Sequence, residues 1–245
     1  MQPKTYRDFY ANESKVYHSR RYGGLYGKLF KRLHHETLRQ MLEKTTGDDV
    51  LEVACGTGHT STLLSELGVR FIACDLTPAM MEKAKDRLAG KTIIPEFLEA
   101  DAFNLPFKEN SFDVIISTRF LHLFEMDKQE ELFEEFNRVL KPGGYLIVDF
   151  DNWYSRWIML IPYLFYNLIK YQRLAPFSVY NRIYKTKCML LKKGINPIQI
   201  QGVGGTHLLL PAMISFNLGL QLGKIHRQWP MLFAAEQFVV LGQKQ

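Results

Sequence analysis

The segment Leu51-Glu52-Val53-Ala54-Cys55-Gly56-Thr57-Gly58 decides how this 245-residue sequence is expected to fold. A short apolar run that carries one acid leads into small residues, and a helix-like segment follows Gly58. Glycines at positions 56 and 58 let a ligand approach the backbone N–H groups at the start of that helix, because no Cβ stands in the way. The segment therefore predicts a buried strand, a turn that faces a ligand, and a helix.

Asp75 indicates the kind of ligand. It lies nineteen residues beyond Gly56, at the end of the next predicted strand, where a carboxylate can accept hydrogen bonds from ribose hydroxyls. A dinucleotide site would need a third glycine where Ser61 stands, and the acid Glu52 suits a pyrophosphate poorly. The pattern favours a nucleoside cofactor with positive charge, and it disfavours an NAD-dependent reductase.

Strand-like and helix-like segments alternate between residues 50 and 150. The apolar spacing predicts helices over 59–67, from Thr77-Pro78 onward and over 128–140, with a tight turn at 141–144. Strands are expected at 50–54, 69–74, 96–99, 112–117 and 145–150, and late strands at 197–201 and 238–241 complete the sheet. This alternation is typical of a doubly wound parallel sheet.

The expected organisation is one domain over residues 1–245 in four parts. Residues 1–45 are predicted to form an N-terminal helical cap and 46–150 the cofactor-binding core. An apolar and basic insertion or lid follows over 151–195, and 196–245 supplies the completing strands and a substrate-side segment.

Two further motifs follow the core in order. Ala100-Asp101-Ala102 comes after the third strand, where an Asp can bind an adenine amine while Ala102 and Phe103 flank the ring. Residues 138–144, Arg-Val-Leu-Lys-Pro-Gly-Gly, precede the fifth strand. With these motifs, residues 45–150 resemble the class I S-adenosylmethionine-dependent methyltransferases, in particular the type 11 small-molecule branch that includes the quinone-biosynthesis methyltransferases.

The resemblance implies a fold, a cofactor and a set of contacts. The fold is α/β, a Rossmann-like doubly wound mixed sheet of seven strands with one antiparallel strand near the C-terminus. The cofactor is S-adenosylmethionine, and its product is S-adenosylhomocysteine. The positions that match cofactor contacts are Glu52, Ala54, Gly56 and Gly58 under the methionine part, Asp75, Leu76, Met80, Asp101, Ala102 and Phe103 around the adenosine, and Ser117 and Thr118 at the end of the fourth strand.

Two parts of this set need comment. Ala54 stands where many family members have glycine, and we expect cofactor binding to be retained with a slightly tighter turn. Tyr17 and Arg21 lie in the N-terminal helical region, which in such enzymes often folds over the cofactor. An arginine there could hold the cofactor carboxylate, although a solvated basic helix face is the alternative.

The methyl acceptor is less well defined. Methyl transfer from a sulfonium is an in-line displacement that needs alignment, exclusion of water and, for a protonated acceptor, a base. His122, after the fourth strand, and His207, in the C-terminal region, are the candidate bases. A structural histidine is the alternative for each.

The last third of the chain points to an apolar partner. Residues 151–245 carry eleven Lys and Arg against only Asp151 and Glu236, a net charge of +9, and aromatic residues interleave with basic ones over 153–184. The hypothesis is a bulky apolar or amphiphilic acceptor, namely a quinone, lipid or aromatic natural product, with peripheral membrane contact through 153–184. A helix that merely packs on the sheet is the alternative.

Composition and the remaining motifs exclude several classes. The chain is 47% hydrophobic and 23% charged, which excludes wholesale disorder, and its three cysteines have neither disulfide-scaffold nor metal spacing. No secretory signal or run of about 20 apolar residues occurs, so a cytoplasmic location with association at a membrane surface is expected. An RNA-modifying enzyme and a non-catalytic S-adenosylmethionine-binding protein stay open, although nucleic acid is disfavoured because Ser117-Thr118 replaces an Asn/Asp-Pro-Pro-aromatic signature.

Overall fold

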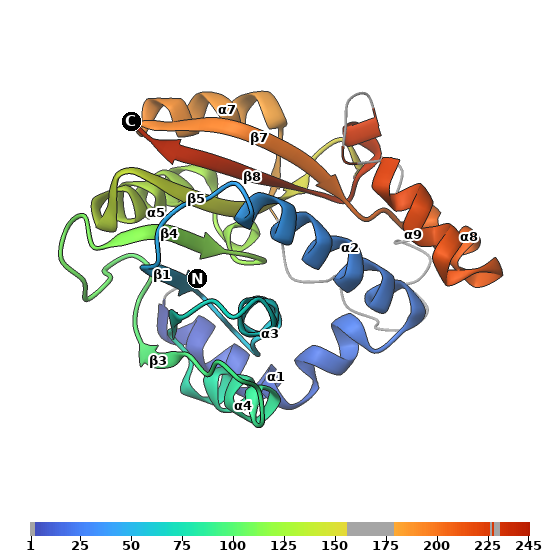
Figure 1. Cartoon of the computed structure of the whole chain (residues 1–245), viewed down its shortest axis with the longest axis horizontal. Coiled ribbons are helices and arrows are strands. Elements are labelled where there is room, and N and C mark those ends of the chain that lie inside the picture. The colour runs from blue at the N-terminus through green and yellow to red at the C-terminus, as the bar shows by residue number, and fades with distance from the viewer. Residues whose placement is uncertain (1–2, 156–178, 226, 228–230) are drawn as a thin grey trace.

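The computed structural model describes residues 3–155, 179–225, 227 and 231–245, and it has one central mixed sheet (Figure 1). The strands lie in the order β3 (Glu96–Glu99), β2 (Phe71–Asp75), β1 (Val50–Val53), β4 (Phe112–Ser117), β5 (Leu140–Asn152), β8 (Gln237–Lys244) and β7 (Ile195–Val203). The two-residue strand β6 (Tyr180–Asn181) pairs with β5 outside this path. The first five strands are parallel, and β8 runs antiparallel to β5 and β7, which confirms the predicted mixed sheet.

Helices cover both faces of the sheet. Their bounds are α1 (Pro3–Tyr22), α2 (Leu25–Leu42), α3 (His59–Glu66), α4 (Pro78–Leu88), α5 (Met126–Val139), α7 (Ile183–Lys192), α8 (Leu209–Ile214) and α9 (Phe216–Ile225). Short 3-10 turns are η1 (Leu121–Leu123), η2 (Thr206–Leu208) and η3 (Met231–Ala234). Within the described residues, no helix is long and apolar enough to cross a membrane.

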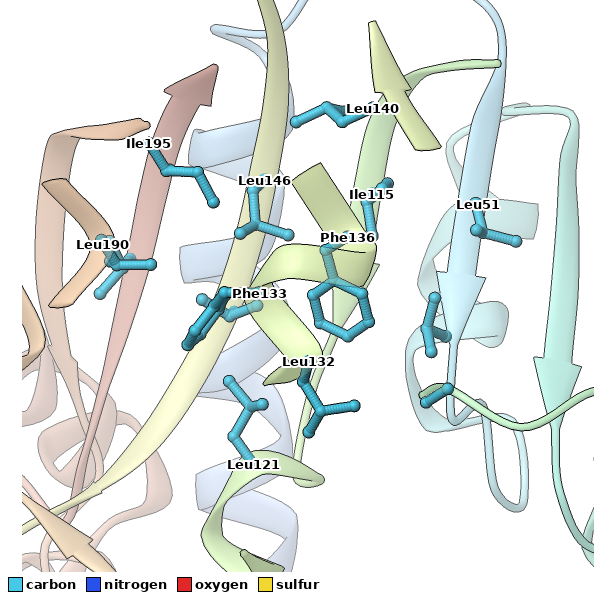
Figure 2. Close-up of a cluster of buried hydrophobic side chains, with 14 of the residues drawn as sticks. Leu51, Ile115, Leu121, Leu132, Phe133, Phe136, Leu140, Leu146, Leu190 and Ile195 are labelled. Carbon is cyan, nitrogen blue, oxygen red and sulfur yellow. The ribbon is translucent and has the colours of Figure 1, made fainter. Parts of the chain in front are cut away.

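The strand sequences explain the two-sided packing. Along β4, Val114 and Ile116 pack into one buried cluster with α2 and α3, while Ile115 between them packs into the other with α5 and α7. Figure 2 shows that second cluster, in which Phe133 and Phe136 of α5 lie against the strands. Successive strand residues point to opposite faces, so a strand covered on both faces reads as an unbroken apolar run.

The N-terminal cap consists of two helices. Helix α1 ends at Tyr22 and α2 begins at Leu25. Gly23 lies at the break, where a Cβ would be 2.4 Å from the carbonyl oxygen of Ser19. The cap stays attached to the domain because one stripe of α2 is buried on the sheet, through Leu29, Leu33 and other apolar residues.

The predicted tight turn at 141–144 is wrong. These residues form the first part of β5, which runs without interruption from Leu140. Gly143 has φ +76°, and the pairing of β5 with β4 changes register between Phe112 and Val114. A local irregularity within a continuous strand therefore replaces the turn.

The predicted insertion is described only in part. Residues 156–178, which contain six of its ten aromatic residues and three of its eight Lys and Arg, lie outside the described residues. The described part supplies β6 and α7, and α7 adds Leu190 to the cluster in Figure 2. Strand β7 already begins at Ile195, the last residue assigned to the insertion.

Candidate cofactor and acceptor site

A cavity of 870 Å³ lies at the carboxyl ends of β1, β2, β3 and β4. Its walls include the segments directly after those strands, namely Ala54–Thr57, Asp75–Thr77, Ala100–Phe103 and Thr118–Phe120. The strand order reverses between β1 and β4, so the connections leave on opposite faces and a crevice opens there. Helix α1 contributes Tyr17 and Tyr22 to the wall.

The turn after β1 has a left-handed backbone. Ala54 has φ +58° and Gly56 has φ +53°. Only glycine adopts this region without steric cost, so Ala54 carries about 1–2 kcal/mol of backbone strain where a glycine would carry none. This strain is the structural consequence of the predicted departure at position 54.

Asp75 organises the turn that faces it. Its Oδ2 accepts the Gly56 N–H at 2.8 Å and its Oδ1 accepts the Thr77 N–H at 2.8 Å. Thr77 is the N-cap of α4 and Pro78 follows at the start of the helix, as predicted, but the side chain that caps the turn is Asp75. Burial raises the pKa of Asp75. The carboxylate therefore links two strand ends and borders the cavity.

Glu52 is a buried acid at the cavity wall. Its side chain is 2% exposed and its Oε2 accepts the Ser61 hydroxyl at 2.6 Å. Burial raises the pKa of Glu52 to about 8, because the charged form is poorly solvated there. A positively charged group in the cavity would compensate that penalty, which is the electrostatic match expected for a sulfonium or ammonium ligand.

The predicted adenosine contacts belong to the wall of the same cavity. Leu76, Met80, Asp101, Ala102 and Phe103 all line the cavity. The Asp101 Oδ1 accepts the Phe103 N–H at 3.0 Å, which fixes the loop after β3. An acid is thus held beside apolar walls, the arrangement expected around the edge and faces of a purine.

Three of the fourteen predicted cofactor contacts do not line the cavity within the described residues: Arg21, Gly58 and Ser117. Arg21 lies over the Tyr17 ring, 5.4 Å from its centroid. Gly58 has φ +77°, and a Cβ there would lie 3.0 Å from that of Ala84 on α4. Ser117 is buried with its hydroxyl unpartnered. For Gly58 the geometry indicates helix packing.

Neither candidate base reaches the cavity wall as described. His122 is buried in η1, where burial lowers the pKa of its ring, and its carbonyl accepts the Val179 N–H at 2.8 Å. His207 lies in η2, and partial burial lowers its pKa too. Their role as bases stays a prediction without geometric support.

Several aromatic side chains line the cavity. Phe103, Phe120 and Phe124 form edge-to-face pairs with ring centroids 5.0 and 5.2 Å apart, and Phe9 and Tyr10 of α1 also line the cavity. Sequence reasoning missed Phe9, Tyr10 and Phe124, because nothing in the pattern places the start of α1 over the loop after β4. Arg119-Phe120 directly after a strand was the available signal.

Replacement of Gly56 and of Gly58 by alanine is expected to affect different properties of the protein, namely ligand affinity and stability. A Cβ at Gly56 meets nothing within 4 Å, so Gly56→Ala costs about 1 kcal/mol of backbone strain but enters the space over the turn. Gly58→Ala adds a contact with Ala84 to the strain, an overpacking cost of about 1–3 kcal/mol.

Urea unfolding and S-adenosylhomocysteine titration of both variants test this contrast. Gly56→Ala should lose more ligand affinity, and Gly58→Ala should lose more stability. Unchanged affinity in Gly56→Ala would show that no ligand approaches this backbone closely.

Comparisons with known proteins agree with this geometry. Residues 51–148 match the family model described as "Methyltransferase domain". The demethylmenaquinone methyltransferase of Clavibacter sepedonicus is 39% identical over 103 residues, which are 42% of this chain and 40% of that protein. A probable phthiotriol/phenolphthiotriol dimycocerosates methyltransferase of Mycobacterium ulcerans is 37% identical over 117 residues, 46% of this chain and 42% of that protein. The chain thus spans less than half the length of these curated relatives.

The fold is shared over nearly the whole chain. The crystal structure of magnesium protoporphyrin IX methyltransferase from Synechocystis PCC 6803, with bound S-adenosylhomocysteine, superposes with a TM-score of 0.67. The superposition covers 99% of each chain at 14% sequence identity, so this likeness is one of fold. Together these comparisons confirm the predicted Rossmann-like methyltransferase fold and the resemblance inferred for the core.

Proposed function

We propose that this chain, with a methyltransferase domain over residues 51–148, transfers the methyl group of S-adenosylmethionine to a bulky apolar or amphiphilic small molecule. The observation that carries the proposal is the mixed lining of the 870 Å³ cavity. Its wall contains acids and a left-handed turn at the strand ends together with a group of aromatic side chains. The volume lies within the usual range for ligand sites, and these two kinds of lining suit a nucleoside and an apolar acceptor.

The relatives bear on the acceptor. Those reported above are named for methylation of a demethylmenaquinone and of phthiotriol dimycocerosates, which are a quinone and lipids. The wall formed by Phe103, Phe120 and Phe124 supports an acceptor of this class in the present chain. The predicted contact with a membrane surface belongs to the same proposal, and its segment 153–184 lies largely outside the described residues.

When bound, S-adenosylmethionine supplies an activated methyl group. The chain supplies alignment and exclusion of water. Asp75 and Asp101 would hold the adenosine, Glu52 would offset the positive charge of the cofactor, and Thr118 at the end of β4 would border the reacting atoms.

A pair of acceptors tests the proposal. Naphthohydroquinones with and without an apolar tail are incubated with methyl-labelled S-adenosylmethionine and the full chain. We expect micromolar-range binding of the cofactor, no binding of NADH, and a higher kcat/KM for the tailed acceptor.

Phe120→Ala should lower kcat/KM for the tailed acceptor by roughly tenfold, since about 1.5–3 kcal/mol of apolar burial is lost from a buried Phe and this ring is only partly buried. Leu191→Ala, at a 48% exposed position on α7, is the matched control. If neither S-adenosylmethionine nor S-adenosylhomocysteine binds, the proposal fails.

A further inference from the structure

A chain of buried side chains runs from β5 through α2 to the cavity. The Asp149 Oδ2 lies 3.1 Å from His34 Nε2, and His34 Nδ1 lies 3.1 Å from His59 Nε2. His34 and Asp149 are at most 1% exposed, and His59 is 7% exposed. His59 is the only member of the three that lines the described cavity wall.

The hydrogen bonds define which ring nitrogens carry hydrogen. The Asp149 carboxylate only accepts, so His34 Nε2 donates to it and His34 Nδ1 is left as an acceptor. His59 Nε2 must then donate to His34, which leaves His59 Nδ1 unprotonated. That Nδ1 is buried and has no hydrogen-bond partner. A free lone pair therefore remains at the end of the chain.

The surroundings of His59 disfavour a positive charge on its ring. Burial lowers the pKa of His18 to about 4 and of His35 to about 3, and the pKa of His59 is lowered as well. The titratable and charged groups around His59 are His18 and Tyr22 of α1, Lys31, His34 and His35 of α2, Arg87 of α4, and Asp149 of β5. Lys31 opposes a further positive charge on His59, so the neutral form of this ring is favoured.

His59 is also placed close to the expected reaction centre. The next residue, Thr60, shares a hydrogen bond of 2.7 Å with Thr118 at the end of β4. The Tyr22 ring stacks on His59 with centroids 4.5 Å apart and planes 7° apart, and its hydroxyl is buried without a partner. Both rings line the cavity, so two unsatisfied polar atoms lie in the side chains of one wall.

We propose that His59 Nδ1 is the base that takes the proton of the methyl acceptor, with His34 and Asp149 as positioning residues. This inference rests on the proposed methyltransferase function. The acceptor X–H bond breaks, its proton joins Nδ1, and its electron pair forms the bond to the methyl carbon as the carbon–sulfur pair passes to sulfur. His59 can pass its Nε2 proton to His34 Nδ1, and His34 can pass its Nε2 proton to Asp149. The positive charge is then neutralised by the Asp149 carboxylate. The extra proton returns to water when the product leaves.

The Asp149→Asn variant tests this arrangement. The Arg119 N–H donates to Asp149 Oδ1 at 2.6 Å, so the amide oxygen of Asn will face Arg119 and its NH₂ group will face His34. The hydrogen bond between position 149 and His34 and the one between His34 and His59 then both run in the opposite direction. As a result, His59 Nδ1 carries the hydrogen. ¹⁵N-histidine NMR of the full chain, with and without S-adenosylhomocysteine, reads these tautomers directly.

We expect wild-type His59 to be unprotonated at Nδ1 at pH 7, and Asp149→Asn to reverse its tautomer. His59→Gln keeps a donor to His34 but removes the base. It should bind S-adenosylhomocysteine within about threefold of wild type and lose about 100-fold or more in kcat toward a naphthohydroquinone at pH 7. Its rate should rise about tenfold per pH unit, since the acceptor must then ionise by itself.

His35→Gln is the matched control, because His35 Nε2 bonds only the carbonyl oxygen of His59 and a Gln amide can replace that donor. A protonated His59 Nδ1 in the wild type, unchanged tautomers in Asp149→Asn, or a His59→Gln rate equal to wild type would overturn the proposal. Failure of the wild type to bind S-adenosylhomocysteine would instead refute the proposed function. The tautomers of the ligand-free protein would still show whether the hydrogen bonds between Asp149, His34 and His59 run as inferred.

Discussion

Asp75→Ala is expected to abolish measurable binding of S-adenosylmethionine and S-adenosylhomocysteine. The variant removes an acceptor that ribose hydroxyls are proposed to use and that holds the Gly56 and Thr77 N–H groups now. Hydrogen bonds to a charged group contribute about 1.5–3 kcal/mol each, so loss of two ribose contacts should weaken binding by at least about 100-fold. The released turn adds to this loss.

Calorimetric titration of the full chain measures the effect, and a surface acid supplies the control. Asp86 lies on α4 and pairs with Lys83, with its side chain 68% exposed, so Asp86→Ala removes the same charge far from the strand ends. Its affinity should match the wild type. If Asp75→Ala bound both ligands as the wild type does, Asp75 would not contact the ribose and the assignment of the nucleoside site would fail.

The core of the fold could be predicted because its determinants are local. The strand predicted at 112–117 coincides with β4, and those at 50–54 and 69–74 differ from β1 and β2 by one or two residues at an end. Strands buried on both faces read as apolar runs, and glycines and acids mark their carboxyl ends. The contacts expected from Asp75, Asp101 and Met80 follow from that regularity, and all three border one cavity.

The hydrogen-bonded series Asp149–His34–His59 could not be predicted because its members are distant in sequence. His34 is 115 residues from Asp149 and 25 from His59, and only the packing of α2 across the sheet brings them together. The available signal was His59 itself, directly after Gly58 and therefore at the start of the helix below the ligand turn. A polar ring at that position needs either a hydrogen-bond partner or a role in the function.

The position of His122 relative to the cavity also could not be predicted from the sequence. Its position after β4 placed it near the expected reaction centre, but the chain turns inward there and η1 buries the ring. Arg119 reaches the cavity wall instead, with φ +58° and its backbone N–H bound by Asp149. The direction of one residue after a strand depends on such backbone geometry, which residue types alone do not define.

Glu52 is expected to make cofactor affinity strongly dependent on pH. In the free protein burial raises its pKa to about 8, so the carboxyl is about nine-tenths protonated at pH 7. A cofactor with positive charge favours the ionised form, and binding should therefore release close to one proton at pH 7. If only the ionised form binds, affinity should rise about 20-fold from pH 6 to pH 7.5.

Titrations in two buffers of different ionisation heat measure the proton release, and Glu52→Gln is the control. Ser61 can still donate to the amide oxygen of Gln, so the local packing is kept. This variant should release no proton at this site, bind more weakly than wild type at pH 7.5, and show affinity nearly independent of pH. Equal proton release by both proteins would contradict the assignment to Glu52.

The same pKa shift has a consequence for stability, and its sign is fixed by linkage. Because the pKa in the folded state exceeds the ordinary value of 4.5, the folded protein binds the proton more tightly than the unfolded chain. The stability gained below pH 4.5 is therefore lost as the pH rises toward about 8, by an amount on the order of 4 kcal/mol. His18 and His35 act in the opposite direction below pH 6.5, because their pKa values are lowered.

The difference in free energy of unfolding between wild type and Glu52→Gln isolates the Glu52 contribution. It should grow in favour of the variant from pH 5 to pH 8 and shrink once S-adenosylmethionine is bound. If the wild type remained less stable than Glu52→Gln by the same amount at saturating S-adenosylmethionine, the bound cation would not offset the cost of the buried carboxylate.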